Sequence, residues 1–227
     1  YFALANNINN ELDEFGALGN SAVGYMALYS NTTGFGNNAI GDRALYSNTT
    51  GYGNSATGLV SLYSNTTGGE NTGVGIQSLY TNTTGDFNTA VGAEALYANT
   101  TASYNTALGW ESLNSNTTGE NNSAVGYRSM WSNTTGEKNT ALGNDALYSN
   151  TTGSQNTTIG NNAGYSNVTG ANNVFIGYKA GYSETGSNKL YIDNSDTSSP
   201  LIYGDFANDT VTINGDLTTT GTVTSNS

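Results

Sequence analysis

The chain of 227 residues carries 17 acidic and only 5 basic residues, a net charge of −12, and it contains neither His nor Cys. Without clusters of Lys and Arg, nucleic acid and anionic membrane surfaces are disfavoured as partners. Without Cys there are neither disulfides nor thiolate metal sites. Apolar residues make up only 35% of the chain, which is low for a globular core, and no apolar run is long enough to insert into a membrane.

Residues 1–19 lack the regularity of the central part of the chain, and we predict that they form an N-terminal cap or contact segment. They begin with the apolar residues Tyr1, Phe2 and Leu4, and residues 9–15 can form one helical turn after an Asn cap. Terminal units of repeat proteins are atypical because they close an open end. The chain starts with Tyr1 and shows no signal peptide, so we expect a processed chain or a fragment.

A repeat of 17 residues runs through the region 20–186 without insertion or deletion in its regular part. We number its positions from the leading Asn, which is found at residues 20, 37, 54, 71, 88, 105, 122, 139, 156 and 173. Position 5 is always Gly, and positions 12 to 15 usually read Asn-Thr-Thr-Gly. A fixed period of this kind is typical of solenoid proteins. Gly, Asn and Thr disfavour helix, so the pattern predicts an all-β parallel solenoid of about ten coils.

The unit 139–155 illustrates the predicted coil. Positions 2–4 form a short strand ended by Gly143, Ala-Leu-Tyr-Ser forms a second extended piece, and Asn-Thr-Thr-Gly closes the coil as a turn. We expect Leu142 and Leu147 to fill the interior together with the other aliphatic residues of position 4. These are Val23, Ile40, Val74, Val91, Leu108, Val125, Ile159 and Ile176. Coils stacked at about 4.8 Å would give a rod of roughly 48 Å.

Residues 187–227 leave the period and are predicted to form a β-rich connector or tail. Strands are expected in residues 188–193, 200–205 and 210–216, because each segment is rich in aliphatic or β-branched residues and is bounded by turn residues. Residues 218–227 are polar and rich in Thr, as in a linker or an added strand.

Two short motifs resemble a known family. Asn-Val-Phe-Ile-Gly at 173–177 and Asn-Ser-Ala-Val-Gly at 122–126 resemble the Asn-Ser-Val-Ala-Ile-Gly core of YadA-like head repeats in trimeric autotransporter adhesins. The resemblance covers residues 20–177 and implies a left-handed β-roll that assembles as a homotrimer. The family's repeat is shorter, and the additional residues here fall in the Leu-Tyr-Ser-Asn-Thr-Thr arm. Residues 186–206 look like a module of tail-fibre-like and large secreted surface proteins, which implies a fibre context.

The sequence offers no catalytic constellation. There is no His or Cys to activate a Ser, and the acidic residues at positions 6 and 7 are scattered as on a solvated face. We therefore predict no enzyme, no catalytic residues and no cofactor. Five aspartates, Asp193, Asp196, Asp205, Asp209 and Asp216, could offer oxygen ligands to Ca²⁺, but their spacing matches no calcium loop. Turn-forming Asp is the favoured interpretation, so no metal site is predicted.

Position 10 carries an aromatic column, which is interrupted by Asn114. Rings about 4.8 Å apart are close enough to stack. A structural ladder or a seam between chains is favoured over a glycan-binding stripe. The column consists of Tyr29, Tyr46, Tyr63, Tyr80, Tyr97, Trp131, Tyr148, Tyr165 and Tyr182.

Position 12 carries an asparagine column that matches the N-glycosylation pattern. Asn side chains also form hydrogen bonds up and down a stack of strands. This ladder is favoured over glycosylation because the Asn residues recur once in every coil. The neighbouring Thr rows would suit ice binding only on a flat, exposed face. The column consists of Asn31, Asn48, Asn65, Asn82, Asn99, Asn116, Asn133, Asn150 and Asn167.

These patterns predict a structural subunit of an extracellular fibre or adhesin, at a cell surface or in a virion fibre, that associates with copies of itself. One alternative is a head-to-tail filament, in which a terminal segment containing Tyr1, Phe2 and Leu4, or Val211 and Ile213, lends a strand to a neighbour. Another alternative is a module that binds host or environmental glycans, or ice.

Overall fold

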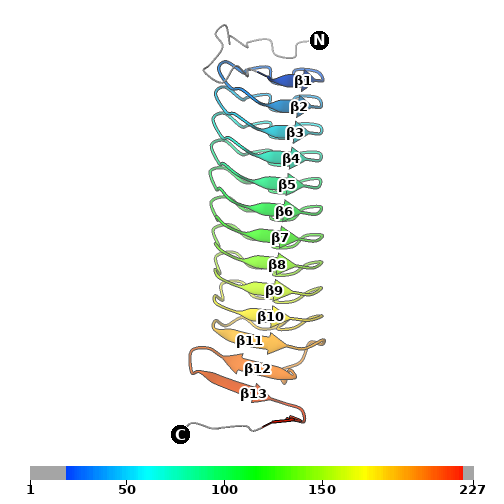
Figure 1. The fold of residues 1–227 in the computed structure, drawn as a ribbon, viewed down its shortest axis with the longest axis vertical. Helices are drawn as coiled ribbons and strands as arrows, with labels where there is room; N and C mark the ends of the chain where they lie inside the picture. Colours follow the sequence, from blue (N-terminus) through cyan, green and yellow to red (C-terminus); the bar gives the residue numbers. More distant parts are fainter. Residues whose placement is uncertain (1–18, 222–227) are drawn as a thin grey trace.

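The computed structural model describes residues 19–221, which form a rod of stacked coils (Figure 1). One sheet runs along the rod, and its thirteen strands are neighbours in sequence order. Strands β1 to β11 pair in parallel, whereas β11, β12 and β13 pair antiparallel. The prediction of an all-β parallel solenoid with a β-rich end is therefore confirmed. The cap and helical turn predicted before residue 19 lie outside the described residues.

Each repeat contributes one strand of three residues, and equivalent residues pair at an offset of 17. The strands of the repeat are β1 Ser21–Val23, β2 Asn38–Ile40, β3 Ser55–Thr57, β4 Thr72–Val74, β5 Thr89–Val91, β6 Thr106–Leu108, β7 Ser123–Val125, β8 Thr140–Leu142, β9 Thr157–Ile159 and β10 Val174–Ile176. The terminal strands are β11 Lys189–Ile192, β12 Ile202–Asp205 and β13 Thr210–Ile213, which confirms the three strands expected after residue 187.

The aliphatic residues at position 4 lie on the outer face of the sheet, so the prediction that they fill the interior is wrong. Leu142 is 46% exposed, whereas Ala141 before it is 1% exposed. Successive side chains of a strand point to opposite faces, so a three-residue strand with its middle residue inward turns both flanking residues outward. The interior is filled by Ala141, Ala146 and Leu147, and the predicted burial of Leu147 is confirmed.

The Ala-Leu-Tyr-Ser segment is not a second strand, contrary to the prediction. Asp145 and Leu147 have φ values of 51° and 52°, which lie in the left-handed region and interrupt an extended chain. The arm still bonds to its neighbours: the Asp145 N–H donates to the Tyr127 carbonyl and the Leu147 N–H donates to the Ala163 carbonyl, both at 2.9 Å. The backbone polar groups are thereby satisfied in both directions without a second strand.

Gly143 shows why position 5 is always Gly. Its φ is +140°, and a Cβ built on it would lie 2.4 Å from the carbonyl oxygen of Gly160 in the next coil. Both the backbone conformation and the close approach of the two coils require the absence of a side chain.

The interior changes where the regular repeat ends. Gly164 and Gly181 occupy the positions of the buried Leu, and Phe175 and Tyr191 occupy the inward strand position that is Ala in most coils. A Cβ on Gly181 would lie 2.5 Å from the Phe175 ring, and one on Gly164 would lie 2.7 Å from it. The large residue has therefore moved from the turn to the strand, which keeps the core filled.

Candidate functional site

The aromatic column forms two stacks on one side of the rod. Tyr29 to Tyr97 have ring centroids 5.2–5.3 Å apart and interplanar angles of 3–10°. Trp131 to Tyr182 have ring centroids 5.0–5.5 Å apart, again nearly parallel. Asn114 separates the stacks and donates from its side chain to the Glu94 carbonyl at 3.2 Å.

Stacking determines what the column can bind. Each interior ring has a neighbouring ring on both faces, so only ring edges are open to a ligand. Burial raises the pKa of Tyr165, and the adjacent Tyr148 and Tyr182 raise it further. A sugar cannot lie flat on an interior ring, and this geometry favours the column's structural role.

The asparagine column is an internal ladder. Asn65 is fully buried, and its Nδ2 donates to Asn48 Oδ1 at 2.8 Å and to the Gly68 carbonyl at 2.9 Å. Its Oδ1 accepts a hydrogen bond from Asn82 Nδ2 at 2.8 Å. The same arrangement extends from Asn31 to Asn150. Because these side chains have no exposure, the folded coil offers their amide nitrogens to no glycan.

A second ladder is formed by the leading Asn of each repeat. Asn139 Nδ2 donates to the Gly153 carbonyl at 2.9 Å, and its Oδ1 accepts the backbone N–H of Asn156 at 2.9 Å. Asn139 therefore ties the start of one coil both to its own closing turn and to the next coil. These two bonds fix the corner at which each coil begins.

The Thr rows divide into an engaged row and an exposed row. The hydroxyl of Thr66, at position 13, donates to the Thr83 carbonyl at 3.0 Å, and the equivalent bond recurs from Thr32 to Thr151. Thr67, at position 14, is exposed. Only one of the two rows therefore keeps free hydroxyls, so the observations do not favour an ice-binding lattice of paired Thr rows.

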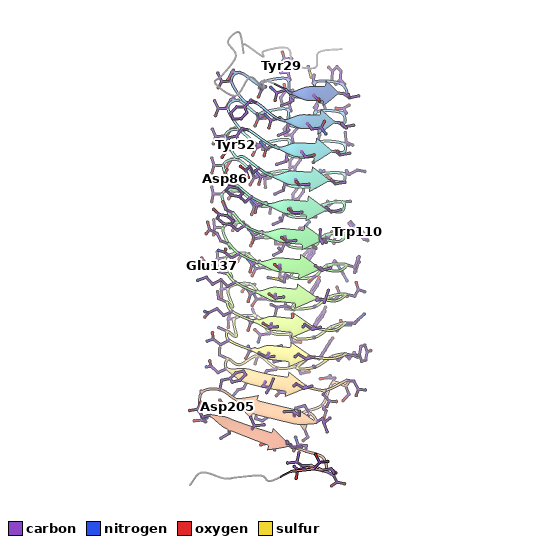
Figure 2. The ribbon with its side chains drawn as sticks, in the orientation of Figure 1. Tyr29, Tyr52, Asp86, Trp110, Glu137 and Asp205 are labelled. Atoms are coloured by element: carbon purple, nitrogen blue, oxygen red, sulfur yellow. The ribbon has the colours of Figure 1, made fainter. Side chains whose placement is uncertain are left out.

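The outer face of the sheet carries an aliphatic column, interrupted only by Thr57 among the ten repeat strands, which sequence reasoning placed inside. Its exposed members are Val23, Ile40, Val74, Val91, Leu108, Leu142, Ile159 and Ile176. Beyond it, position 6 adds exposed apolar residues, among them Ile76 and Trp110. Figure 2 places Trp110 at one edge of the rod, whereas the position 16 residues Tyr52, Asp86 and Glu137 lie at the opposite edge.

Charged side chains form local pairs. Arg128 Nε lies 3.2 Å from Asp145 Oδ1, and its guanidinium lies 4.7 Å from the Tyr127 ring centroid and 5.1 Å from that of Tyr148. Desolvation lowers the pKa of Arg128, but Asp145 and the two tyrosines oppose it and the net pKa is raised. Sequence reasoning missed this cluster, because charges at positions 6 and 7 vary from coil to coil and form no column.

The five terminal aspartates do not come together as a metal site. Asp205 accepts a hydrogen bond from Lys189 Nζ at 3.0 Å and another from Asn208 Nδ2 at 3.0 Å. Asp193 accepts the N–H of Asn194. Within residues 19–221 no three His, Cys, Asp or Glu side chains are grouped so that they could hold a metal ion.

The candidate strand-exchange segments are only partly described. Tyr1, Phe2 and Leu4 lie outside the described residues. Val211 and Ile213 lie in β13, the last strand of the sheet, where they are 66% and 41% exposed. In the described part of the chain β13 pairs with β12 alone.

No family model matches the chain, and no curated protein or solved structure matches it either. Over the stretch that the structure describes, no helix is long and apolar enough to cross a bilayer. The fold itself defines the class: the chain is a β-solenoid repeat protein whose coils each contain one short parallel strand.

Proposed function

We propose that this β-solenoid is a structural subunit of an extracellular fibre or adhesin, without catalytic activity, and that copies associate side by side through the aliphatic column. The observation that carries the proposal is the composition of the outer sheet face. The chain has 22 charged residues, the sum of 5 basic and 17 acidic ones. None of them lies in the ten repeat strands, which expose aliphatic and small polar side chains instead.

A long apolar stripe without charges is a surface that proteins usually cover, and depletion of charge is typical of the centre of an interface. We take the occupant to be a second copy of the chain. The stripe has an aliphatic residue in every one of the ten repeat strands except β3, which has Thr57. A second copy in parallel register presents the same spacing. The resemblance to trimeric adhesin heads supports three copies around a common axis.

The hydrogen bonds between coils support a mechanical role. Asn and Thr ladders join each regular coil to its neighbours, and the backbone donors of the arm bond alternately up and down the rod. A rod held in this way has a fixed length and little freedom to bend. Such a rod is suited to projecting or spacing other domains, which is the task of a fibre subunit.

The test is the oligomeric state of two matched double variants. Val91→Lys with Leu142→Lys places two charges on the aliphatic column, and we expect it to convert a discrete trimer into a monomer in analytical ultracentrifugation. Thr101→Lys with Thr152→Lys adds the same charges to exposed residues of the same two coils, and it should leave the trimer intact. Circular dichroism confirms that both variants fold.

A wild-type chain that stays monomeric at high concentration would refute side-by-side association. Long rods in electron micrographs would instead favour the head-to-tail filament. That second candidate is supported by β13, whose four residues are all exposed and whose outer edge can accept a further strand. Deletion of residues 1–5 should abolish such rods if that segment donates the strand, and should leave a trimer unchanged.

A further inference from the structure

A cavity lies where the regular repeat ends. It has a volume of about 310 Å³, and its walls come from the last regular turn, from β11 and from the segment between β11 and β12. The lining residues are Gly181, Tyr182, Ser183, Glu184, Tyr191, Asp196, Thr197 and Ser198.

The cavity lies beside the last ring of the aromatic column. Tyr182 is the last member of the aromatic column, and it stacks on Tyr165 with centroids 5.0 Å apart. Strands β10 and β11 pair at an offset of 16 residues, so a further coil at this offset would bring Ser198 into the column after Tyr182, and Ser198 lines the cavity together with Tyr182. Ser198 is too small to cover the ring. Among the described residues no aromatic ring covers the second face of Tyr182, although Lys179 Nζ approaches to 5.3 Å from its centroid.

Polar groups surround this ring. Glu184 takes the place of the ladder Asn, and its carboxylate accepts hydrogen bonds from the Tyr191 hydroxyl at 2.8 Å and from the Gly186 N–H at 2.7 Å. It is therefore fixed in orientation before any ligand arrives. Asp196 is exposed and accepts only a long hydrogen bond, 3.4 Å from Ser183 Oγ. The two carboxylates retain lone pairs for further donors.

We propose that this cavity binds a neutral sugar ring, such as a terminal hexose of a glycan. The ring would stack its apolar face on Tyr182 as the next member of the column. Its hydroxyls would donate to Asp196 and Glu184, and the Ser183 and Ser198 hydroxyls would complete the hydrogen bonding. An apolar surface combined with a few oriented polar groups is the usual construction of a small-molecule site. None of the aliphatic residues of the outer sheet face lines the cavity, so the proposal does not depend on the proposed assembly.

The test uses the full chain and the methyl glycosides of glucose, galactose, mannose and N-acetylglucosamine in saturation-transfer NMR. We expect at least one glycoside to bind saturably with a dissociation constant of about 1 mM, as befits an open site with one stacking ring. Tyr182→Ala should weaken this binding about tenfold or more, and Tyr182→Phe should retain it because the ring face is kept. Asp196→Asn should weaken it about fivefold, because an amide accepts a weaker hydrogen bond than a carboxylate.

Tyr63→Ala is the matched control. It removes an interior ring of the column, between Tyr46 and Tyr80, and should leave sugar binding unchanged. Asp196→Asn changes an exposed side chain, so we expect this variant to fold. It therefore tests the site even if Tyr182→Ala unfolds the terminal coils.

Three results would overturn the proposal. The first is that none of the four glycosides binds saturably. The second is binding that Tyr63→Ala weakens as much as Tyr182→Ala, which would place the ligand elsewhere. The third is that the cavity is filled by an aromatic side chain of another copy, seen as an oligomer that Tyr182→Ala dissociates.

Discussion

Replacing one Asn of the ladder tests whether the buried amides hold the coils together. Asn65 lies in the middle of a regular run, is fully buried and joins three consecutive coils through its neighbours in the column. Asn65→Ala removes the amide and leaves the backbone conformation allowed. We expect a large loss of stability from this single change.

The magnitude is set by the bonds that disappear. Asn65 makes three side-chain hydrogen bonds, two as donor and one as acceptor. At about 1 kcal/mol each they sum to about 3 kcal/mol. The Gly68 carbonyl keeps a donor from Asn54 at 2.8 Å, and Asn82 keeps its bond to Gly85 at 3.0 Å. Asn48 Oδ1 loses the Asn65 Nδ2 donor and is left unpaired inside the rod, which adds about 1–2 kcal/mol. The expected cost is about 4–5 kcal/mol.

The assay is urea unfolding combined with hydrogen exchange. Thr67→Ala is the control, because Thr67 lies two residues away in the same turn and is exposed; it should cost less than about 0.5 kcal/mol. In Asn65→Ala we expect amide exchange to accelerate first in the adjoining coils, since solenoid stability is a sum of neighbour contacts. Equal losses in the two variants would refute the assignment of stability to the ladder.

A second substitution at the same residue adds a pH dependence. Asn65→Asp puts a carboxyl group against Asn48 Oδ1 and the Gly68 carbonyl, both of which are acceptors. Burial and these acceptors raise its folded-state pKa above the unfolded value of about 3.9. The loss of stability caused by Asn65→Asp should therefore be small below about pH 4 and should increase as the pH rises toward the folded-state pKa of the new carboxyl group. Asn65→Ala should lack this dependence.

Three further predictions concern the coil corner and the C-terminal end. Gly143→Ala should cost about 2–6 kcal/mol in urea unfolding, because a Cβ there combines backbone strain with a clash. Phe175→Ala and Gly181→Leu should each destabilise the rod, but the double variant should be at least about 1 kcal/mol more stable than their sum, as a double-mutant cycle would show. The hydrogen bond from Lys189 lowers the pKa of Asp205. The stability that this pair adds is therefore present above about pH 4 and is lost as the pH falls through the folded-state pKa of Asp205. Asp205→Asn should remove this acid dependence from hydrogen exchange in β11 and β12.

The period of the sequence was sufficient to predict the solenoid and its axis of stacking. A residue that recurs every 17 positions meets its own copy in the next coil, so the contacts of Asn48 with Asn65 and of Tyr46 with Tyr63 can be predicted by counting alone. The regular spacing also made the ladder preferable to a glycan array. These inferences needed no knowledge of which way any side chain points.

The period does not encode which side chains of a strand point into the interior. In a three-residue strand the alternation of faces fixes the two flanking residues relative to the middle one, but either face can be the inner one. Apolarity suggested Leu142 as the buried residue, whereas the structure buries Ala141. The reason is the width of the interior: Leu147 enters it from the opposite arm, and only a small residue fits against it. The same constraint explains why Phe175 appears on a strand only where the opposing residue is Gly181.

The cavity at the end of the aromatic column results from the same packing rule. The coil 173–188 is one residue shorter than the regular coils, as the 16-residue offset between β10 and β11 shows, and Ser198 lines the cavity beside Tyr182. A stack of equal coils that all carry an aromatic residue covers every interior ring with the next ring, so a ring lacks a neighbour only beside a coil without one, as at Asn114, or where the period ends. A ligand site along the regular column is therefore disfavoured, because stacking closes the faces there. Open ring faces are expected where the repeat fails, and the open face of Tyr182 is surrounded by hydrogen-bonding groups.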